Sequence, residues 1–422
     1  MLLVRLKDKK INADQSRRAA VDSTANTNLV HWADHLLALK EVALPYAVDP
    51  VTLETRCYDP FKQVKSKTFT AHPKYDPYRD ELVVFGYEAK GLGTNDIITY
   101  SIDRSGTIIN EFWVKQPYEK PGFIHDCAIT PNWLILFVWP FEADVERMKK
   151  GGHHWAYDYS RGLTLIVVPR DANNPKGKGW KAGEYRSYNW KNCMPIHTAA
   201  GWEDSASGNI FVESSRVHDN AFPFFPPDEE NPRMPPPDAK ADYVRWKIDP
   251  AQPDRSLVED PLVVLDCPSE FPRIDERFMS AEYDIVWLNV FIPGKSDGST
   301  NVFQGLNGLA MHSNKTGKTR WYYAGDNSLI QEPIFVPRTD DAPEGDGYVI
   351  ALVERREANR CDLVVLDTET FEEPIALVQL PLHVKAQIHG NWVSAEALGG
   401  YKPVVRPVEV DAISGLGSLE PF

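Results

Sequence analysis

The stretch Asn132–Pro140, NWLILFVWP, decides the fold class of this chain of 422 residues. It is a run of aliphatic, β-branched and aromatic side chains, bounded by Asn at one end and Pro at the other. Apolar runs of about four to eight residues between turn-forming residues are typical of buried strands. Similar runs recur along the chain: ELVVFGYEA (81–89), LTLIVVPR (163–170), YDIVWLNVF (283–291) and YVIALVERR (348–356).

Turn sequences separate these runs, and helical periodicity is nearly absent. Stretches such as DRSG (103–106) and SNKTG (313–317) carry the residues that favour turns. The best helical candidate, ADVERMKKG (143–151), is short. Many short strands in series favour a propeller over one sandwich, although no Trp-Asp or kelch-type repeat is present. We therefore predict an all-β propeller formed as a single domain by residues 1–422.

Composition excludes several classes of protein. The chain has 46 Lys and Arg against 60 Asp and Glu, a net charge of −14, which disfavours nucleic-acid binding. Its five cysteines are scattered without a Cys-x-x-Cys pair, which indicates free thiols and neither a disulfide framework nor a cysteine zinc site.

The sequence also bears on location. No apolar run of about 18 residues is present, and the start, MLLVRLKDKK, is too short and too charged for a signal peptide. We expect a cytoplasmic protein, with peripheral membrane contact through a loop left open. The Pro-rich stretch 222–240, FPFFPPDEENPRMPPPDAK, reads as a long loop, either a lid or a solvated insertion.

Four histidines lie in similar settings, after or between strand-like runs and beside small or apolar residues: His72, His125, His197 and His389. Any one of them alone is more simply a buried core histidine. In a propeller, however, inner strands of separate blades face one axis, so histidines far apart in sequence can converge there. Imidazoles suit Fe, Zn, Cu or Ni, and carboxylates would be needed to accept hydrogen bonds from their distal nitrogens.

Seven motifs, in order, resemble the signatures of the carotenoid cleavage oxygenases, over about Asn26 to Val393. The family resemblance implies a seven-bladed β-propeller, with a helical and loop cap over one face and an axial Fe(II) bound by four histidines. It implies His72, His125, His197 and His389 as ligands, and Glu41, Glu270 and Glu332 as the residues that orient them. The motifs are AHPKYDP (71–77), IHDCAIT (124–130), HTAAGWED (197–204), SEFPRID (269–275), QEPIFVPR (331–338), EGDGYVIALV (344–353) and IHGNWV (388–393).

The segment that contains LALKE (37–41) resembles the stilbene-cleaving branch of this family. In that branch the lysine at the position of Lys40 hydrogen-bonds the 4-hydroxyl of the substrate. A phenol that is deprotonated or strongly hydrogen-bonded pushes electron density into the conjugated double bond, and a lysine in a dry pocket has the depressed pKa that assists this. The resemblance thus implies a dioxygenase that uses O2 to cleave the central double bond of a 4-hydroxystilbene to two aldehydes.

The chain departs from the family pattern at its start. Family members begin well upstream, with strands that help to close the propeller and a tyrosine that shares the hydroxyl contact with the lysine. MLLVRLKDKKINADQSRRAAVDSTANTN stands in their place, so we expect an N-terminally shortened member, and the completeness of its N-terminal blade stays open. Two alternatives to stilbene cleavage stay open: a carotenoid or apocarotenoid cleavage dioxygenase, and an inactive truncated propeller.

Overall fold

The structure is a computed structural model, and it describes residues 23–222, 225, 241–295, 306–381, 383–384 and 388–400. Within these residues the chain is almost entirely β. The predicted helical candidate forms one short helix, α3 (Val145–Lys149), which Asp144 caps by accepting from the backbone N–H groups of Glu146 and Arg147. The described part contains no helix long and apolar enough to cross a membrane. Most of the Pro-rich stretch 222–240 lies outside the described residues.

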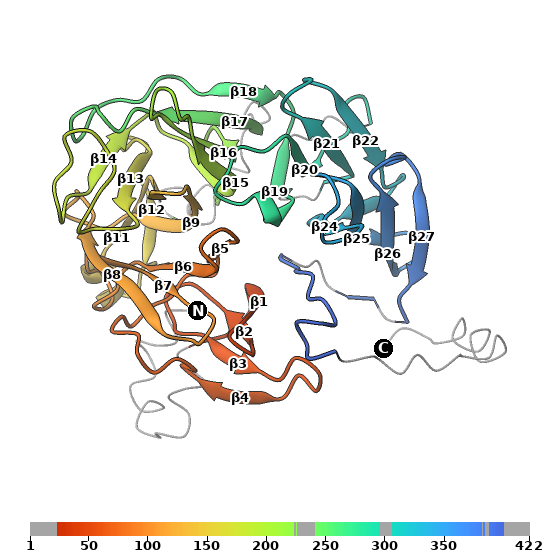
Figure 1. Cartoon of the computed structure of the whole chain (residues 1–422), viewed down its shortest axis with the longest axis horizontal. Coiled ribbons are helices and arrows are strands. Elements are labelled where there is room, and N and C mark those ends of the chain that lie inside the picture. Colours follow the sequence, from red (N-terminus) through yellow and green to blue (C-terminus); the bar gives the residue numbers. More distant parts are fainter. Residues whose placement is uncertain are drawn as a thin grey trace.

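Six antiparallel sheets follow one another along the chain and stand around a common centre (Figure 1). The first sheet is β1 (Asn28–Trp32), β2 (His35–Leu39), β3 (Tyr46–Val48) and β4 (Thr55–Tyr58). The second is β5 (Lys74–Asp76), β6 (Glu81–Gly86), β7 (Asp96–Ile102) and β8 (Ile108–Lys115). The third is β9 (Phe123–Ile129), β10 (Trp133–Trp139), β13 (Thr164–Pro169) and β14 (Arg186–Asn189).

The remaining three sheets continue in the same direction. The fourth is β15 (Met194–Glu203), β16 (Ile210–Val217), β17 (Ala241–Ile248) and β18 (Leu262–Leu265). The fifth is β19 (Ser269–Ile274), β20 (Ile285–Val290), β21 (Gly308–Ser313) and β22 (Thr319–Tyr323). The sixth is β23 (Ser328–Ile330), β24 (Ile334–Pro337), β25 (Gly347–Arg355), β26 (Arg360–Asp367) and β27 (Pro374–Gln379). The all-β propeller predicted from the strand runs is confirmed.

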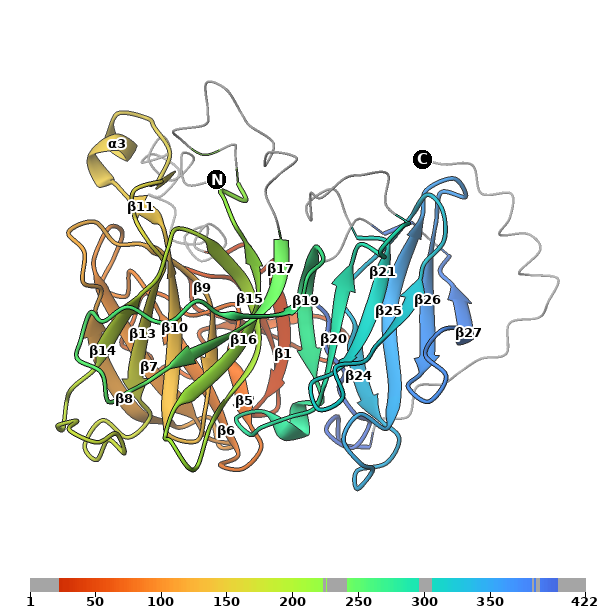
Figure 2. The ribbon, with the colours of Figure 1, turned by 90° about the horizontal axis from the view of Figure 1, so that it is seen from above.

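The predicted number of blades is wrong, since the described residues form six blade sheets of four or five strands and not seven; the only other sheet among them is the two-stranded hairpin β11–β12. The number came from the family pattern and not from a count of strand runs, and the runs between residues 23 and 400 supply strands for six. A helical cap is also not seen among the described residues. The hairpin of β11 (Phe141–Ala143) and β12 (Trp155–Tyr157), with α3 between its strands, rises beyond one end of the sheets (Figure 2).

Apolar layers hold neighbouring sheets face to face. One cluster joins the first two sheets, through residues such as Leu37 and Val84, and another joins the fifth and sixth, through Trp287 and Val364. The largest cluster spans the sheets between them. Burial of this apolar area is the main stabilising contribution to such a layered fold.

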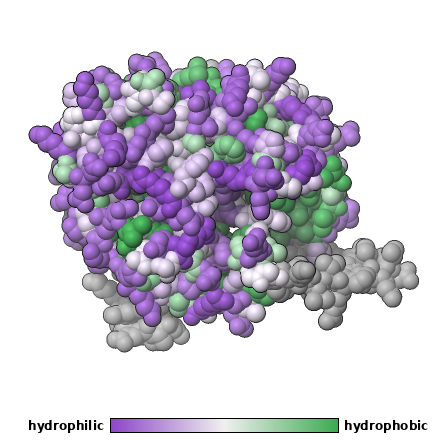
Figure 3. All heavy atoms as spheres, viewed as in Figure 1, coloured by the Kyte–Doolittle hydropathy of each residue, from purple (hydrophilic) through white to green (hydrophobic). Residues whose placement is uncertain are grey.

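The outer strand of the sixth sheet lacks such a partner. None of the three apolar clusters of described residues joins the sixth sheet to the first. Ile375, Leu377 and Val378 of β27 are all about half exposed. Hydrophobic side chains gather on the side of the molecule where this sheet lies (Figure 3). The segment that follows β27 runs between the sixth and first sheets (Figure 1).

Two leucine truncations test this difference in packing. Leu136→Ala, in the fully buried strand β10, should lower the free energy of unfolding by about 2–5 kcal/mol because it leaves a cavity. Leu377→Ala, at a side chain that is 51% exposed, should change it by no more than about 0.5 kcal/mol. Denaturant midpoints of the two variants measure the difference. Equal losses would contradict an exposed β27.

Candidate metal centre

Four histidines from distant parts of the chain meet at the centre of the ring of sheets. His72 lies just before β5, His125 in β9, His197 in β15, and His389 in the segment after β27. One ligand atom from each lies within 4.8 Å of the others. The converging inner strands explain this proximity, because β9, β15 and β19 are neighbours around the centre (Figure 1).

Every sheet places one residue at this centre. In order around the ring, the first five sheets contribute Glu41, His72, His125, His197 and Glu270. The sixth sheet contributes Glu332, from the link between β23 and β24, and His389 comes from the segment that follows. Because no sheet supplies more than one of these groups, the centre forms only when the whole ring is assembled.

Three of the imidazoles are oriented by carboxylates through their Nδ1 atoms. Glu41 Oε1 lies 2.5 Å from His125 Nδ1, and Glu270 Oε2 lies 2.5 Å from His197 Nδ1. Glu332 Oε1 lies 3.2 Å from His389 Nδ1. A carboxylate that accepts from Nδ1–H fixes the tautomer in which the Nε2 lone pair is available to a metal.

Two of the four Nε2 atoms of the cluster have no hydrogen-bond partner among the described residues. The Nε2 atoms of His125 and His197 lie 3.1 Å apart, facing each other. Those of His72 and His389 are buried and have no hydrogen-bond partner among the described residues. Buried polar atoms are rarely left without a partner, so a cation between these rings fits the arrangement.

Electrostatics keep much of the cluster in the form that a metal requires. Burial, and then the neighbouring histidines, hold the pKa of His72 well below its ordinary value, so its ring is neutral. Burial also lowers the pKa of His389. Burial alone would raise the pKa of Glu332, but Arg273 and His389 lower it to about 2, so this residue is a carboxylate at neutral pH. Burial also acts to lower the pKa of His197, but Glu270 outweighs it and raises that pKa, so the lowered pKa values are those of His72 and His389.

A clasp of polar residues holds His389 in place although no regular strand carries it. Arg273 Nη1 donates to the carbonyl of Gly390 at 3.1 Å, and Arg273 Nη2 donates to Asn391 Oδ1 at 3.0 Å. Asn391 in turn donates to Asn28 Oδ1 at 3.0 Å and to the carbonyl of Leu29 at 2.6 Å, both in β1. The clasp therefore connects the fifth sheet, the segment of His389 and the first sheet.

Sequence reasoning assigned no role to the residues of this clasp. Arg273 and Asn391 both lie inside motifs that carried the resemblance, SEFPRID and IHGNWV. Their position within these motifs was therefore the sequence feature that could have pointed to them. Which polar groups they join depends on contacts between segments more than 100 residues apart in the chain.

One side of the cluster is aromatic. The ring of Phe271 stacks on His197 with centroids 4.9 Å apart, and that of Trp139 lies 5.2 Å from His125. Phe123 stacks on Trp139 at 5.2 Å. Phe271 reaches this position with φ of +50°, a left-handed conformation that a bulky residue seldom adopts. These rings shield His125 and His197 from water on the sides that they cover.

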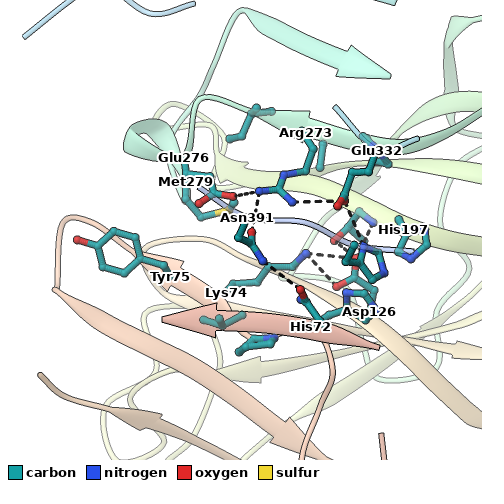
Figure 4. A pocket seen from close by; sticks show the side chains of 18 of the residues that line it. His72, Lys74, Tyr75, Asp126, His197, Arg273, Glu276, Met279, Glu332 and Asn391 are labelled. Carbon is teal, nitrogen blue, oxygen red and sulfur yellow. Dashed lines mark hydrogen bonds and ion pairs between the residues drawn. The ribbon is translucent and has the colours of Figure 1, made fainter. Parts of the chain in front are cut away.

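Another side of the cluster opens into a polar pocket of about 110 Å³ (Figure 4). Its lining includes His72, His197 and His389 together with Lys74 and Asp126. Figure 4 shows the ion pair of Lys74 and Asp126, and it shows Arg273 in contact with Glu276, Glu332 and Asn391. The centre thus has chemically different surroundings on different sides.

The structure places Lys40, the predicted substrate-activating lysine, at the end of β2. It is half-buried and directly precedes Glu41, whose carboxylate contacts His125. Lys40 is therefore adjacent in sequence to a residue that contacts the histidine cluster. It does not line the polar pocket of Figure 4.

Residues 3–394 match the family described as retinal pigment epithelial membrane protein. This chain belongs to that family, the carotenoid oxygenases. The match covers most of the chain, and the family predicted from the seven motifs is confirmed.

Similar proteins of known activity are oxygenases. The chain is 64% identical over 407 residues to resveratrol cleavage oxygenase 1 of Botryotinia fuckeliana, covering 96% of this chain and 72% of that protein. It is 35% identical over 380 residues to an isoeugenol monooxygenase of Pseudomonas putida, covering 89% and 76%. The crystal structure of Pseudomonas brassicacearum lignostilbene dioxygenase matches with a TM-score of 0.80 at 36% identity, covering 88% and 75%.

The orienting role of the carboxylates can be tested on metal affinity. Glu270→Gln keeps the shape of the side chain but removes the charge that the Nδ1–H of His197 donates to. Loss of such a partner lowers metal affinity by about 10–100-fold. Competition with a chelator measures the change, with Glu259→Gln at an exposed glutamate as the control. Equal affinity of the two variants would contradict the role of Glu270.

Proposed function

We propose that this protein is an Fe(II)-dependent dioxygenase that cleaves the central double bond of a 4-hydroxystilbene to two aldehydes. The observation that carries the proposal is the cluster of four imidazoles with Nε2 atoms facing one another and carboxylates behind three of them. In this proposal His72, His125, His197 and His389 hold the metal. Glu41, Glu270 and Glu332 orient three of those ligands.

Iron is consistent both with four imidazole nitrogens as ligands and with the names of the similar proteins. Four imidazole nitrogens accommodate Fe, Zn, Cu or Ni, so the donor set alone leaves the metal open. The similar proteins are named as oxygenases or dioxygenases, which supports the redox-active choice. Bound Fe(II) would supply the activation of dioxygen.

The aromatic side of the centre supports a planar phenolic substrate. Trp139 and Phe271 present ring faces next to His125 and His197, and together with Phe123 they exclude water there. Resveratrol and lignostilbene, named in two of the similar proteins, each carry a 4-hydroxyphenyl ring conjugated to a central double bond. One O2 per alkene balances the reaction, because each of the two alkene carbons takes one oxygen atom and becomes an aldehyde.

Lys40 is the residue that we propose contacts the phenol. Its place next to Glu41 supports this, because it puts the lysine beside the metal centre on the first sheet. A hydrogen bond from its side chain to the 4-hydroxyl oxygen would favour the phenolate. The phenolate then pushes electrons through the ring into the double bond, which makes the alkene more reactive toward oxygen.

The direct test is to express the chain, load it with Fe(II), and incubate it with resveratrol under air. We expect about one iron per chain and two aldehydes in equal amounts. Isoeugenol and an apocarotenal, offered separately, distinguish cleavage of a propenylphenol or a polyene from stilbene cleavage. Bound iron without aldehydes from resveratrol would contradict the substrate, and soluble protein that binds no iron would contradict the function.

Lys40→Met tests the activation of the phenol. The variant should keep its iron and lose about 5–30-fold in kcat/KM for resveratrol, because one polar contact to the substrate contributes roughly 1–2 kcal/mol. A stilbene whose 4-hydroxyl is methylated serves as the control, since it cannot form a phenolate and should be nearly insensitive to the substitution. Unchanged turnover of resveratrol would remove Lys40 from the mechanism.

A further inference from the structure

Lys74 and Asp126 form an ion pair in the wall of the polar pocket beside the metal centre (Figure 4). Lys74 Nζ lies 2.9 Å from Asp126 Oδ1 and 3.2 Å from Oδ2. The side chain of Lys74 is 12% exposed and that of Asp126 is 2% exposed. Each is a close neighbour in sequence of a proposed ligand, His72 and His125. Within the described residues, neither side chain hydrogen-bonds to any of the four imidazoles.

Asp126 does not need Lys74 to satisfy its hydrogen-bonding capacity. The backbone N–H of Cys127 donates to Oδ1 at 2.7 Å. The backbone N–H of Thr198 donates to Oδ2 at 2.8 Å, and the hydroxyl of Thr198, which is also 2.6 Å from the carbonyl of Cys127, lies 3.0 Å from Oδ2. The two backbone donors fix the carboxylate in place. Lys74 therefore adds charge to the site rather than geometry.

The charges around the centre match a divalent cation. The groups that set this charge are the side chains of low exposure that contact the imidazoles or line the polar pocket. Four carboxylates against two cations leave two negative charges, and a divalent ion on four neutral imidazoles cancels them. The carboxylates are Glu41, Glu270, Glu332 and Asp126, and the cations are Lys74 and Arg273. Glu276, whose side chain is 50% exposed, pairs with Arg273 at the outer end of the pocket and is screened by solvent.

Removal of one cation would change this balance. Without the charge of Lys74 the same set carries three negative charges, which suits a trivalent ion. In a buried site of low effective dielectric constant, uncompensated charge is costly and long-range interactions between charges are strong. A metal that can change its oxidation state would feel this difference directly.

We propose that Lys74 sets the buried charge of the metal centre and thereby its preference for a divalent over a trivalent ion. Lys74 then acts at a distance, through its charge in the wall of the pocket, and contacts neither the metal nor the substrate. The proposal rests on the metal site of the proposed function but not on its substrate. It assigns a purpose to an ion pair that the cleavage of a stilbene does not itself require.

The test uses three variants of the full chain, each loaded with Fe(II) alone. Lys74→Met removes the charge and keeps the length of the side chain, whereas Lys74→Arg keeps the charge. The double variant Lys74→Met/Asp126→Asn removes both charges of the pair and restores the balance. A redox titration followed by the electron paramagnetic resonance signal of ferric iron measures the midpoint potential of each protein.

We expect Lys74→Met to lower the potential, with a relative gain in ferric over ferrous affinity on the order of tenfold. Lys74→Arg and the double variant should stay near the wild-type value. An unchanged potential in Lys74→Met with full iron content would overturn the proposal, and so would equal shifts in Lys74→Met and the double variant. If Lys74→Met fails to fold, a double variant shifted from the wild-type potential would overturn it. Wild-type protein without bound iron would instead overturn the proposed function on which the inference rests.

Discussion

The hydrogen bonds between imidazoles and carboxylates are the interactions on which the rest of the site depends. An imidazole that offers Nε2 to a metal must keep its proton on Nδ1, and the carboxylates of Glu41, Glu270 and Glu332 hold it there. Each carboxylate reaches its histidine from another sheet or segment. The sheets of the propeller must therefore pack in register before the centre exists, which links the stability of the fold to the formation of the site.

Much of this arrangement could be predicted from the sequence, but by two different routes. Apolar runs such as NWLILFVWP and their turn sequences indicated the all-β fold from local chemistry alone. The four histidines stood out by their apolar neighbours, whereas Glu41, Glu270 and Glu332 came only from the family resemblance. The predicted number of blades was wrong because it, too, was taken from the family resemblance. The contacts of Arg273 and Asn391, and the pairing of Lys74 with Asp126, could not be predicted, because each joins segments that only the fold brings together.

The surroundings of the centre divide its tasks between its sides. The aromatic rings of Trp139 and Phe271 pack beside His125 and His197 and exclude water there. The polar pocket lies next to His72, His197 and His389, and the ion pair of Lys74 and Asp126 places fixed charge in its wall. In the proposals made above, contact with the substrate belongs to Lys40 and control of the metal's charge belongs to Lys74, so variants should change one while leaving the other intact.

The most direct test of this account is X-ray absorption spectroscopy at the iron edge of the Fe(II)-loaded chain. The account predicts that all protein ligands are imidazoles, with the multiple-scattering pattern of four histidine rings and no carboxylate oxygen bound to the metal. A spectrum that requires two histidines and a bound carboxylate would contradict it, because Glu41, Glu270 or Glu332 would then be a ligand and could not orient an imidazole.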